Sequence, residues 1–136
     1  MLMFRRYAAP MFHIEFDEAR HFVRVTGTGT WNPIELARFA MAARRIEVQL
    51  VGRSDVRILG DARRMTVQPE AVAMLCRGFA TRLLAKRGLR LALIADSVLL
   101  RMQMERTYEG LAVGIFMSEE EALAYLGIAE HAQQAA

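Results

Sequence analysis

The fold is decided by two short apolar stretches that each lead into an acidic residue, Ile58-Leu59-Gly60-Asp61 and Leu91-Ala92-Leu93-Ile94-Ala95-Asp96-Ser97. The second stretch is apolar on both faces apart from the preceding Arg90, which is typical of a central strand in a parallel sheet. A segment of helical periodicity follows each stretch. This order predicts a parallel α/β sheet, and it indicates the scaffold more clearly than it indicates any chemistry.

Two alternating segments precede these repeats. Residues 11–17 place Phe12, Ile14 and Phe16 on one face, and residues 22–27 alternate in the same way after a short polar turn. Such a pair predicts a β-hairpin. Further strands are expected over residues 56–59, 89–95 and 111–116. The complete order is ββαβαβαβα, a mixed and mostly parallel sheet of about five strands with four helices.

Helix starts are marked by capping residues. Asn32 precedes Pro33 and Glu35, and Ser118 precedes Glu121, so both helices are predicted to begin with a capping box. The third helix is capped by Asp96 or Ser97. The second begins near Pro69. The apolar side chains expected to face the core are Val72, Leu75, Cys76, Phe79 and Leu83 in the second helix, and Ala122, Leu123, Tyr125 and Leu126 in the fourth.

Length and composition indicate one globular domain. The chain has 136 residues, of which 54% are hydrophobic, enough for a packed core without a metal or disulfide. We expect a single domain over residues 11–128, with a flexible N-terminal segment (1–10) and a tail (129–136). Cys76 is the only cysteine, which excludes an internal disulfide and suits a cytoplasmic protein. No transmembrane segment and no signal peptide are expected.

The charge is modest but uneven. The net charge is +3, and residues 38–90 carry most of the excess of arginine. A basic surface of this kind could attract nucleic acid or an anionic membrane, although a solvated arginine-rich surface is the simpler interpretation. The aromatic residues fall mainly on predicted core faces and offer no platform for stacked bases. We therefore expect no nucleic-acid partner, and leave a peripheral membrane contact open.

Five stretches occur in a set order along the chain: Val23-Arg24-Val25-Thr26-Gly27-Thr28, Arg57-Ile58-Leu59-Gly60-Asp61-Ala62-Arg63, the strand ending in Asp96-Ser97, Arg101-Met102-Gln103-Met104-Glu105, and Gly114-Ile115-Phe116-Met117-Ser118 with the helix after it. In this order they resemble the STAS domain family, and within it the SpoIIAA-like, STAS/SEC14-type bacterial proteins. The resemblance spans residues 11–127. It implies a SpoIIAA-like fold that is related to the CRAL-TRIO lipid-transfer domain, and it implies little about function.

The chain departs from the anti-anti-sigma factors of that family at one position. Those proteins carry a phosphorylated serine at the start of the second helix. Here that position reads Pro69-Glu70-Ala71-Val72, and the nearest hydroxyl belongs to Thr66. We therefore expect no phosphorylation site, and the partner-switching role that depends on one is not expected.

The candidate ligand site lies where the two acidic strands end. Asp61 and Asp96 are predicted to share the carboxyl edge of the sheet, where open α/β proteins bind ligands. Arg63, Arg64, Ser97 and Arg101 would lie beside them and could bind a phosphate or carboxylate. The alternative is structural, with Asp96 as a helix cap and Asp61 paired to an arginine.

Other chemistry is weakly supported. His13, His21 and His131 have no metal-ligand spacing, Cys76 falls on an apolar stripe, and Thr26-Gly27-Thr28-Gly29-Thr30 lacks the lysine of a phosphate loop. We expect no catalytic residue, no metal and no cofactor. Several of the nine methionines could adapt to an apolar ligand, or simply fill the core.

Three hypotheses follow. The first is a non-catalytic binding module that holds an apolar, lipid-like or anionic small molecule and self-associates as a homodimer. The dimer contact would use apolar surface on the side of the central strands that lacks helices, together with the apolar residues 1–4. The second is an anti-anti-sigma-type regulator that binds a protein partner without a phosphorylatable serine. The third, the least favoured, is a small enzyme that uses Asp61 and Asp96.

Overall fold

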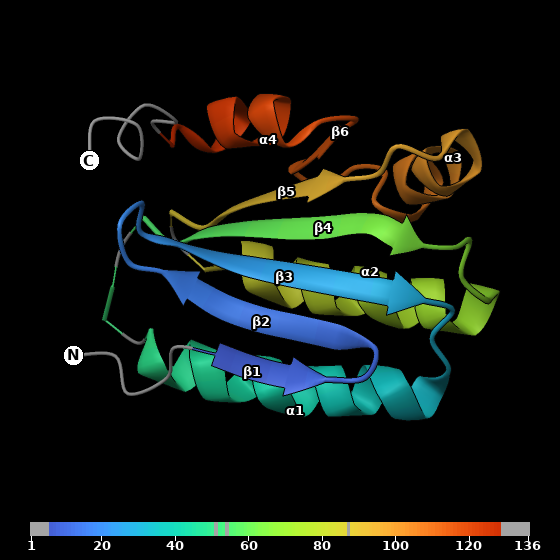
Figure 1. Cartoon of the computed structure of the whole chain (residues 1–136), viewed down its shortest axis with the longest axis horizontal. Helices are drawn as coiled ribbons and strands as arrows, with labels where there is room; N and C mark the ends of the chain where they lie inside the picture. Colours follow the sequence, from blue (N-terminus) through green and yellow to red (C-terminus); the bar gives the residue numbers. More distant parts are fainter. Residues whose placement is uncertain (1–5, 51, 54, 87, 129–136) are drawn as a thin grey trace.

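A single six-stranded sheet organises the molecule. The computed structural model describes residues 6–50, 52–53, 55–86 and 88–128. Within them the strand order is β1-β2-β3-β4-β5-β6 (Figure 1), with antiparallel pairing from β1 to β3 and parallel pairing from β3 to β6. The strands are β1 (Arg6–Ala9), β2 (Phe12–Asp17), β3 (Phe22–Gly29), β4 (Arg57–Met65), β5 (Arg90–Ile94) and β6 (Val113–Phe116). The helices are α1 (Pro33–Gln49), α2 (Glu70–Leu84), α3 (Val98–Thr107) and α4 (Glu119–Leu126).

The mixed, mostly parallel sheet with four helices confirms the predicted fold class, but the strand count differs. The additional strand is β1, which pairs with β2 from Arg6↔Glu15 to Ala9↔Phe12. It is four residues long, too short for alternation to be read from the sequence, and the Tyr7 ring stacks on Phe12 at 5.6 Å. Residues 1–5, which include the apolar residues 1–4 expected at the dimer contact, and the predicted tail (129–136) lie outside the described residues.

Strand β4 is longer than the sequence predicted. The predicted strand ended at Leu59, with Asp61 just after it, whereas the observed strand continues to Met65 and holds Asp61 in its middle. Beyond Asp61 the strand pairs with the end of β3, where Thr28 is opposite Arg64 after a bulge between Thr26 and Thr28. Aspartate is depleted in strands, and Arg63 and Arg64 are charged, so this extension has no apolar pattern.

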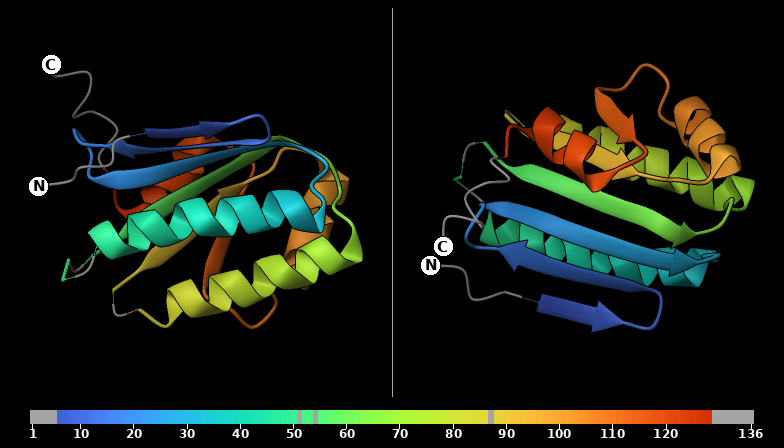
Figure 2. Two further views of the ribbon diagram at one scale, coloured as in Figure 1. Left: turned by 90° about the horizontal axis from the view of Figure 1, so that it is seen from below. Right: turned by 45° about the horizontal axis from the view of Figure 1, so that its top comes forward.

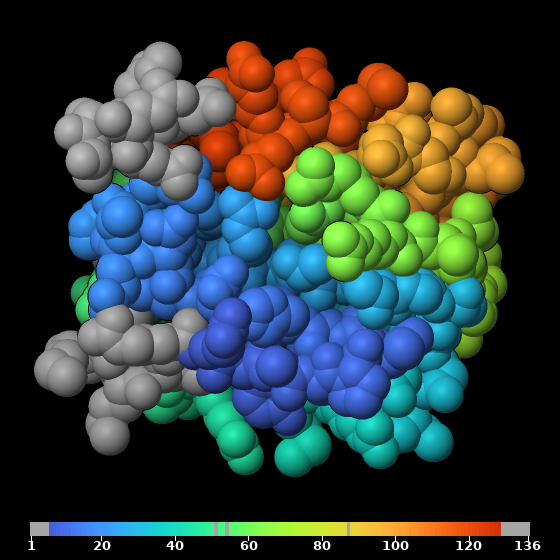
Figure 3. All heavy atoms as spheres, viewed as in Figure 1, coloured from blue at the N-terminus to red at the C-terminus, as the bar shows by residue number. Residues whose placement is uncertain are grey.

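The helices cover the two faces of the sheet unequally. α1, α2 and α3 pack on one face and α4 on the other (Figure 2). α4 buries Leu59, Ala92 and Ile94, none of which is accessible to solvent. The expectation that the apolar strand β5 leaves an uncovered apolar face is therefore wrong. Beside α4 the surface is formed by β1, β2 and β3 (Figure 3), whose outward side chains, such as Glu15 and Arg24, are polar.

Two predicted core residues lie at the surface. Leu75 is 52% exposed on α2, because the inward face of that helix is centred on Val72, Ala80 and Leu83. Tyr125 is 41% exposed on α4, where its ring rests against Phe116 at 5.2 Å. Both residues sit at the margin of their helix's apolar stripe, where spacing alone does not separate buried from exposed positions.

The predicted caps are present. The Asn32 side chain accepts a hydrogen bond from the backbone N–H of Glu35 at 2.8 Å, and Ser118 Oγ accepts one from Glu121 at 3.2 Å. Of the two candidates for the third cap, Ser97 is the one used, and its Oγ accepts from Leu100 N–H at 3.3 Å. These caps fix where α1, α3 and α4 leave the sheet.

Candidate functional site

A large apolar cavity lies between the sheet and helices α1, α2 and α3, which pack on the same face of it. Its volume is about 480 Å³. Central strands form its floor through Val25, Ile58 and Leu93, and α1, α2 and α3 form its roof and sides. These three floor residues are only half-buried although they lie beneath helices, because the cavity separates them from the helices above. This cavity could not be predicted from the sequence, since apolar residues that line a cavity and apolar residues that fill a core have the same periodicity.

Two glycines on the floor let neighbouring side chains lie flat against the sheet. A Cβ at Gly60 would lie 2.6 Å from Cδ2 of Leu93, and one at Gly27 would lie 2.5 Å from Sδ of Met65. Larger residues at either position would push Leu93 or Met65 up into the cavity. The lack of a side chain at Gly27 and Gly60 therefore keeps Met65 and Leu93 out of the cavity.

Aromatic side chains brace the roof. Phe39 of α1 contacts Phe79 of α2 edge-on, with ring centroids 5.5 Å apart. It also contacts Trp31 at 5.3 Å and Phe12 at 5.4 Å. Such pairs contribute about 0.5–1.5 kcal/mol each beyond their buried area. They hold α1 and α2 together above the floor, so the cavity has a preformed shape.

The carboxyl end of the cavity is closed by a hydrogen-bonded network. Gln68 and Gln103 exchange two bonds: Gln103 Nε2 donates to the Gln68 carbonyl at 2.7 Å, and the Gln68 N–H donates to Gln103 Oε1 at 2.8 Å. Gln68 Oε1 accepts from the Trp31 N–H at 2.8 Å, and Trp31 Nε1 donates to the Thr28 carbonyl. Trp31 and Gln103 are 5% and 8% exposed, so this end is sealed and its polar atoms are engaged.

The opposite end, near the amino ends of the strands, is polar and open. Its lining residues include Glu47, Arg53 and Lys86, of which Arg53 and Lys86 are exposed. Lys86 Nζ lies 3.5 Å from Glu47 Oε2, while Arg53 has no ion pair among the described residues. The cavity therefore has an apolar body, a sealed end and a charged mouth.

One wall of the cavity holds the only cysteine. Burial raises the pKa of the Cys76 thiol to about 11, although a hydrogen bond with Tyr108 acts in the opposite direction. Burial also raises the pKa of the Tyr108 hydroxyl. Both groups are therefore neutral near pH 7, and the thiol is a poor nucleophile. They extend the apolar lining rather than supply a reactive centre.

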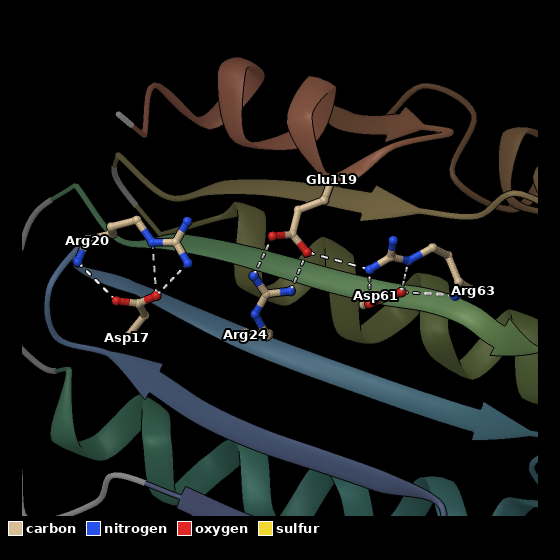
Figure 4. A network of polar contacts seen from close by, with 6 residues as sticks. All are labelled: Asp17, Arg20, Arg24, Asp61, Arg63 and Glu119. Carbon is tan, nitrogen blue, oxygen red and sulfur yellow. Dashed lines mark hydrogen bonds and ion pairs between the residues drawn. The ribbon is translucent and has the colours of Figure 1, made fainter. Parts of the chain in front are cut away.

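Two of the six residues singled out from the sequence, Asp61 and Arg63, belong to an ion-pair network on the other face of the sheet (Figure 4). Arg63 donates to both carboxylate oxygens of Asp61, at 3.0 and 2.7 Å. Glu119, at the start of α4, accepts two hydrogen bonds from Arg24 of β3, at 2.9 and 3.0 Å, and lies 3.5 Å from Arg63. The network ties α4 to β3 and β4.

These contacts lower the pKa of both carboxyl groups. The hydrogen bonds from Arg24 lower the pKa of Glu119 against the opposing effect of burial. For Asp61 burial raises the pKa, but the hydrogen bonds and charge of Arg63 outweigh it and the net shift is downward. The carboxyl groups of Asp61 and Glu119 are therefore ionised at neutral pH, and both are already paired with arginines of the protein. This matches the structural interpretation of Asp61 that the sequence left open.

The remaining candidates do not join this network. Asp96 is exposed after β5, and its charge acts on Arg63, while Ser97 serves as the α3 cap. No hydrogen bond or ion pair links the Arg64 or Arg101 side chain to the others among the residues described. Within the same residues no cluster of histidine, cysteine or acidic side chains could hold a metal. No helix there has the length and apolarity needed to cross a membrane.

Comparison with solved structures identifies the type of fold. No protein-family model matches the chain, and no curated protein matches it. A solved structure of an uncharacterised DUF3478-family protein with a SpoIIAA-like fold, from Shewanella loihica PV-4, matches with a TM-score of 0.59 and 13% sequence identity. The match covers 93% of this chain and 97% of that one. The chain therefore has a SpoIIAA-like fold, as its five stretches predicted.

Proposed function

We propose that the protein is a non-catalytic binding module that holds an apolar, lipid-like small molecule between its sheet and helices α1, α2 and α3. The observation that carries this proposal is the cavity of about 480 Å³, which falls within the range of about 300–1,000 Å³ for small-molecule sites. Packed interiors contain few voids larger than a water molecule. A cavity of this size is thus a feature of binding proteins.

The lining supports binding rather than chemistry. Aliphatic and aromatic side chains form most of the walls, and the polar atoms of Gln68 and Gln103 already bond to protein partners. The neutral Cys76 thiol is not activated. We place this role in the cytoplasm, where a chain with a single cysteine stays reduced.

Titration with N-phenyl-1-naphthylamine, a neutral apolar fluorophore, tests the proposal. We expect saturable binding of one fluorophore per chain, accompanied by a change in the emission of Trp31, the single tryptophan, which lies in the cavity wall. Met41→Gln is the matched control, because Met41 is 68% exposed on the outer face of α1. Binding that is lost in Met41→Gln, or that does not saturate, would assign the fluorophore to the surface and contradict the proposal.

We also propose that the protein self-associates through the outer face of α1. Ile34, Met41 and Val48 are spaced by seven residues and are 64%, 68% and 64% exposed, so they form one apolar stripe. A second α1 could cover this stripe in a two-fold dimer. Light scattering at micromolar concentration should give twice the chain mass of 15.4 kDa, and Met41→Glu should give the monomer. A monomer before substitution contradicts this proposal.

The regulatory alternative would use the same stripe for a protein partner. It gains no support from the start of α2, where Glu70 is the first helical residue and Thr66 is bonded to Thr30. Co-purification of one partner protein at equal stoichiometry, lost in Met41→Glu, would favour that alternative over self-association.

A further inference from the structure

The two ends of the cavity differ in a way that specifies the ligand's polarity. Resting on the proposed binding function, we propose that the ligand is a single-chain anionic amphiphile whose head group lies at the mouth beside Arg53 and whose hydrocarbon tail runs toward Trp31. Three features of the described residues determine this orientation: the sealed end, the polar hollow at the mouth and the charge around it.

The sealed end has no place for a polar head. Each polar atom of the Trp31, Gln68 and Gln103 side chains is hydrogen bonded within the protein. A head group there would leave its own polar atoms without partners or would break this network, and either outcome costs free energy in a buried site. A hydrocarbon chain end requires no partner, so the tail belongs at this end.

A second, more polar hollow of about 280 Å³ adjoins the mouth and shares lining residues with it. Arg53, Leu50 and Val56 line both spaces, so Arg53 stands at the junction of the apolar cavity and the hollow. His21, Asp55 and Arg57 line the hollow as well, and the Asp55 carboxylate is paired with Arg57 at 3.2 Å. It therefore gives a head group room, beside polar side chains, where the apolar walls end.

The charge around this junction is positive. Arg53 has no ion pair among the described residues, and its guanidinium lies 6.0 Å from the centre of the Phe16 ring. The Nε of Arg57 is buried and has no acceptor in the described structure, although its terminal nitrogens bond to Asp55 and to the end of α4. The nearest acidic group of the cavity itself, Glu47, is shared by Lys86 and Arg82, at 3.5 and 3.8 Å. An anionic head group would meet the guanidinium of Arg53 here, which has no carboxylate partner among the described residues.

Competition between two ligands of equal chain length tests this inference. Dodecanoate and 1-dodecanol, each below its aggregation concentration, would compete with bound N-phenyl-1-naphthylamine. We expect the acid to bind at least tenfold more tightly than the alcohol, Arg53→Gln to remove that preference, and Arg53→Lys to keep most of it. Arg44→Gln is the control, because Arg44 is exposed on α1 and lines neither space.

The outcomes separate the two claims. Equal binding of acid and alcohol, or a preference that survives Arg53→Gln, would overturn the assignment of the head group while leaving the apolar cavity as a binding site. Failure of the fluorophore to bind at all would overturn the proposed function and this inference with it. Circular dichroism of each variant confirms that the fold is retained.

Discussion

Adding a side chain to the cavity should cost little stability yet block binding. Ala80 of α2 lines the cavity and is 3% exposed, whereas Ala122 of α4 is fully buried in the packed cluster on the other face. Substitution by leucine at either position keeps good helix propensity and adds three carbon atoms. The two variants therefore differ mainly in the space available to the new atoms.

The two substitutions are expected to change the free energy of unfolding differently. In the cavity, three buried carbons at about 0.8 kcal/mol each give an upper bound of about 2.4 kcal/mol of added stability, so Ala80→Leu should be neutral to stabilising. At Ala122 the same atoms must displace packed neighbours, at a typical cost of about 1–3 kcal/mol. For a domain of this length, 1 kcal/mol corresponds to roughly 3–5 °C in Tm.

Urea denaturation followed by circular dichroism measures both changes, and fluorophore titration measures binding. We expect Ala80→Leu to keep or raise the unfolding free energy while weakening binding at least tenfold. Ala122→Leu should lower the unfolding free energy and leave binding by the folded protein unchanged. Equal destabilisation by the two variants would mean that the space beside Ala80 is already filled and that no binding cavity exists there.

Three further predictions concern caps, pH and thiol reactivity. Asn32→Ala and Ser118→Ala should each lower the unfolding free energy by about 1 kcal/mol, because each removes a helix cap; unchanged urea midpoints would argue against the caps. The pKa of Glu119 is lower in the folded protein than its ordinary value near 4.5, so its contribution to stability is complete above pH 4.5 and is lost as the pH falls through the folded pKa. Glu119→Gln should flatten that acid-side loss in thermal melts, and an identical pH profile would contradict the role of the network. At pH 8 Cys76, with its pKa raised to about 11, should react with Ellman's reagent about a hundredfold more slowly than an unperturbed thiol; a rate like that of free cysteine would place it outside the apolar wall.

Most of the scaffold could be predicted from the sequence because its elements have strong local signals. The caps at Asn32 and Ser118, the alternation of the hairpin and the apolar run in β5 all reflect backbone requirements that nearby residues satisfy. The edge strand β1 and the polar end of β4 could not be predicted, since their pairing depends on neighbouring strands rather than on their own pattern. The position of α4 on the opposite face is likewise set by tertiary packing.

The candidate site was harder to predict. The sequence suggested that Asp61 could pair with a nearby arginine, and Arg63 is that partner, but it did not indicate that Arg24 and Glu119, distant in the chain, complete the network. The cavity is a property of the space between side chains, and residue types alone do not report it. Among the expectations from the sequence, only that of an apolar ligand agrees with the presence of the cavity.

We propose above all that the apolar cavity binds an apolar small molecule. Native mass spectrometry of the protein purified without detergent from its own host, with Ala80→Leu purified in parallel, tests it most directly. We expect an added mass of one small molecule on each unsubstituted chain, released on denaturation, and its loss in Ala80→Leu. A bound molecule that persists unchanged in Ala80→Leu, or unsubstituted chains that carry no added mass and gain none on incubation with N-phenyl-1-naphthylamine, would contradict it.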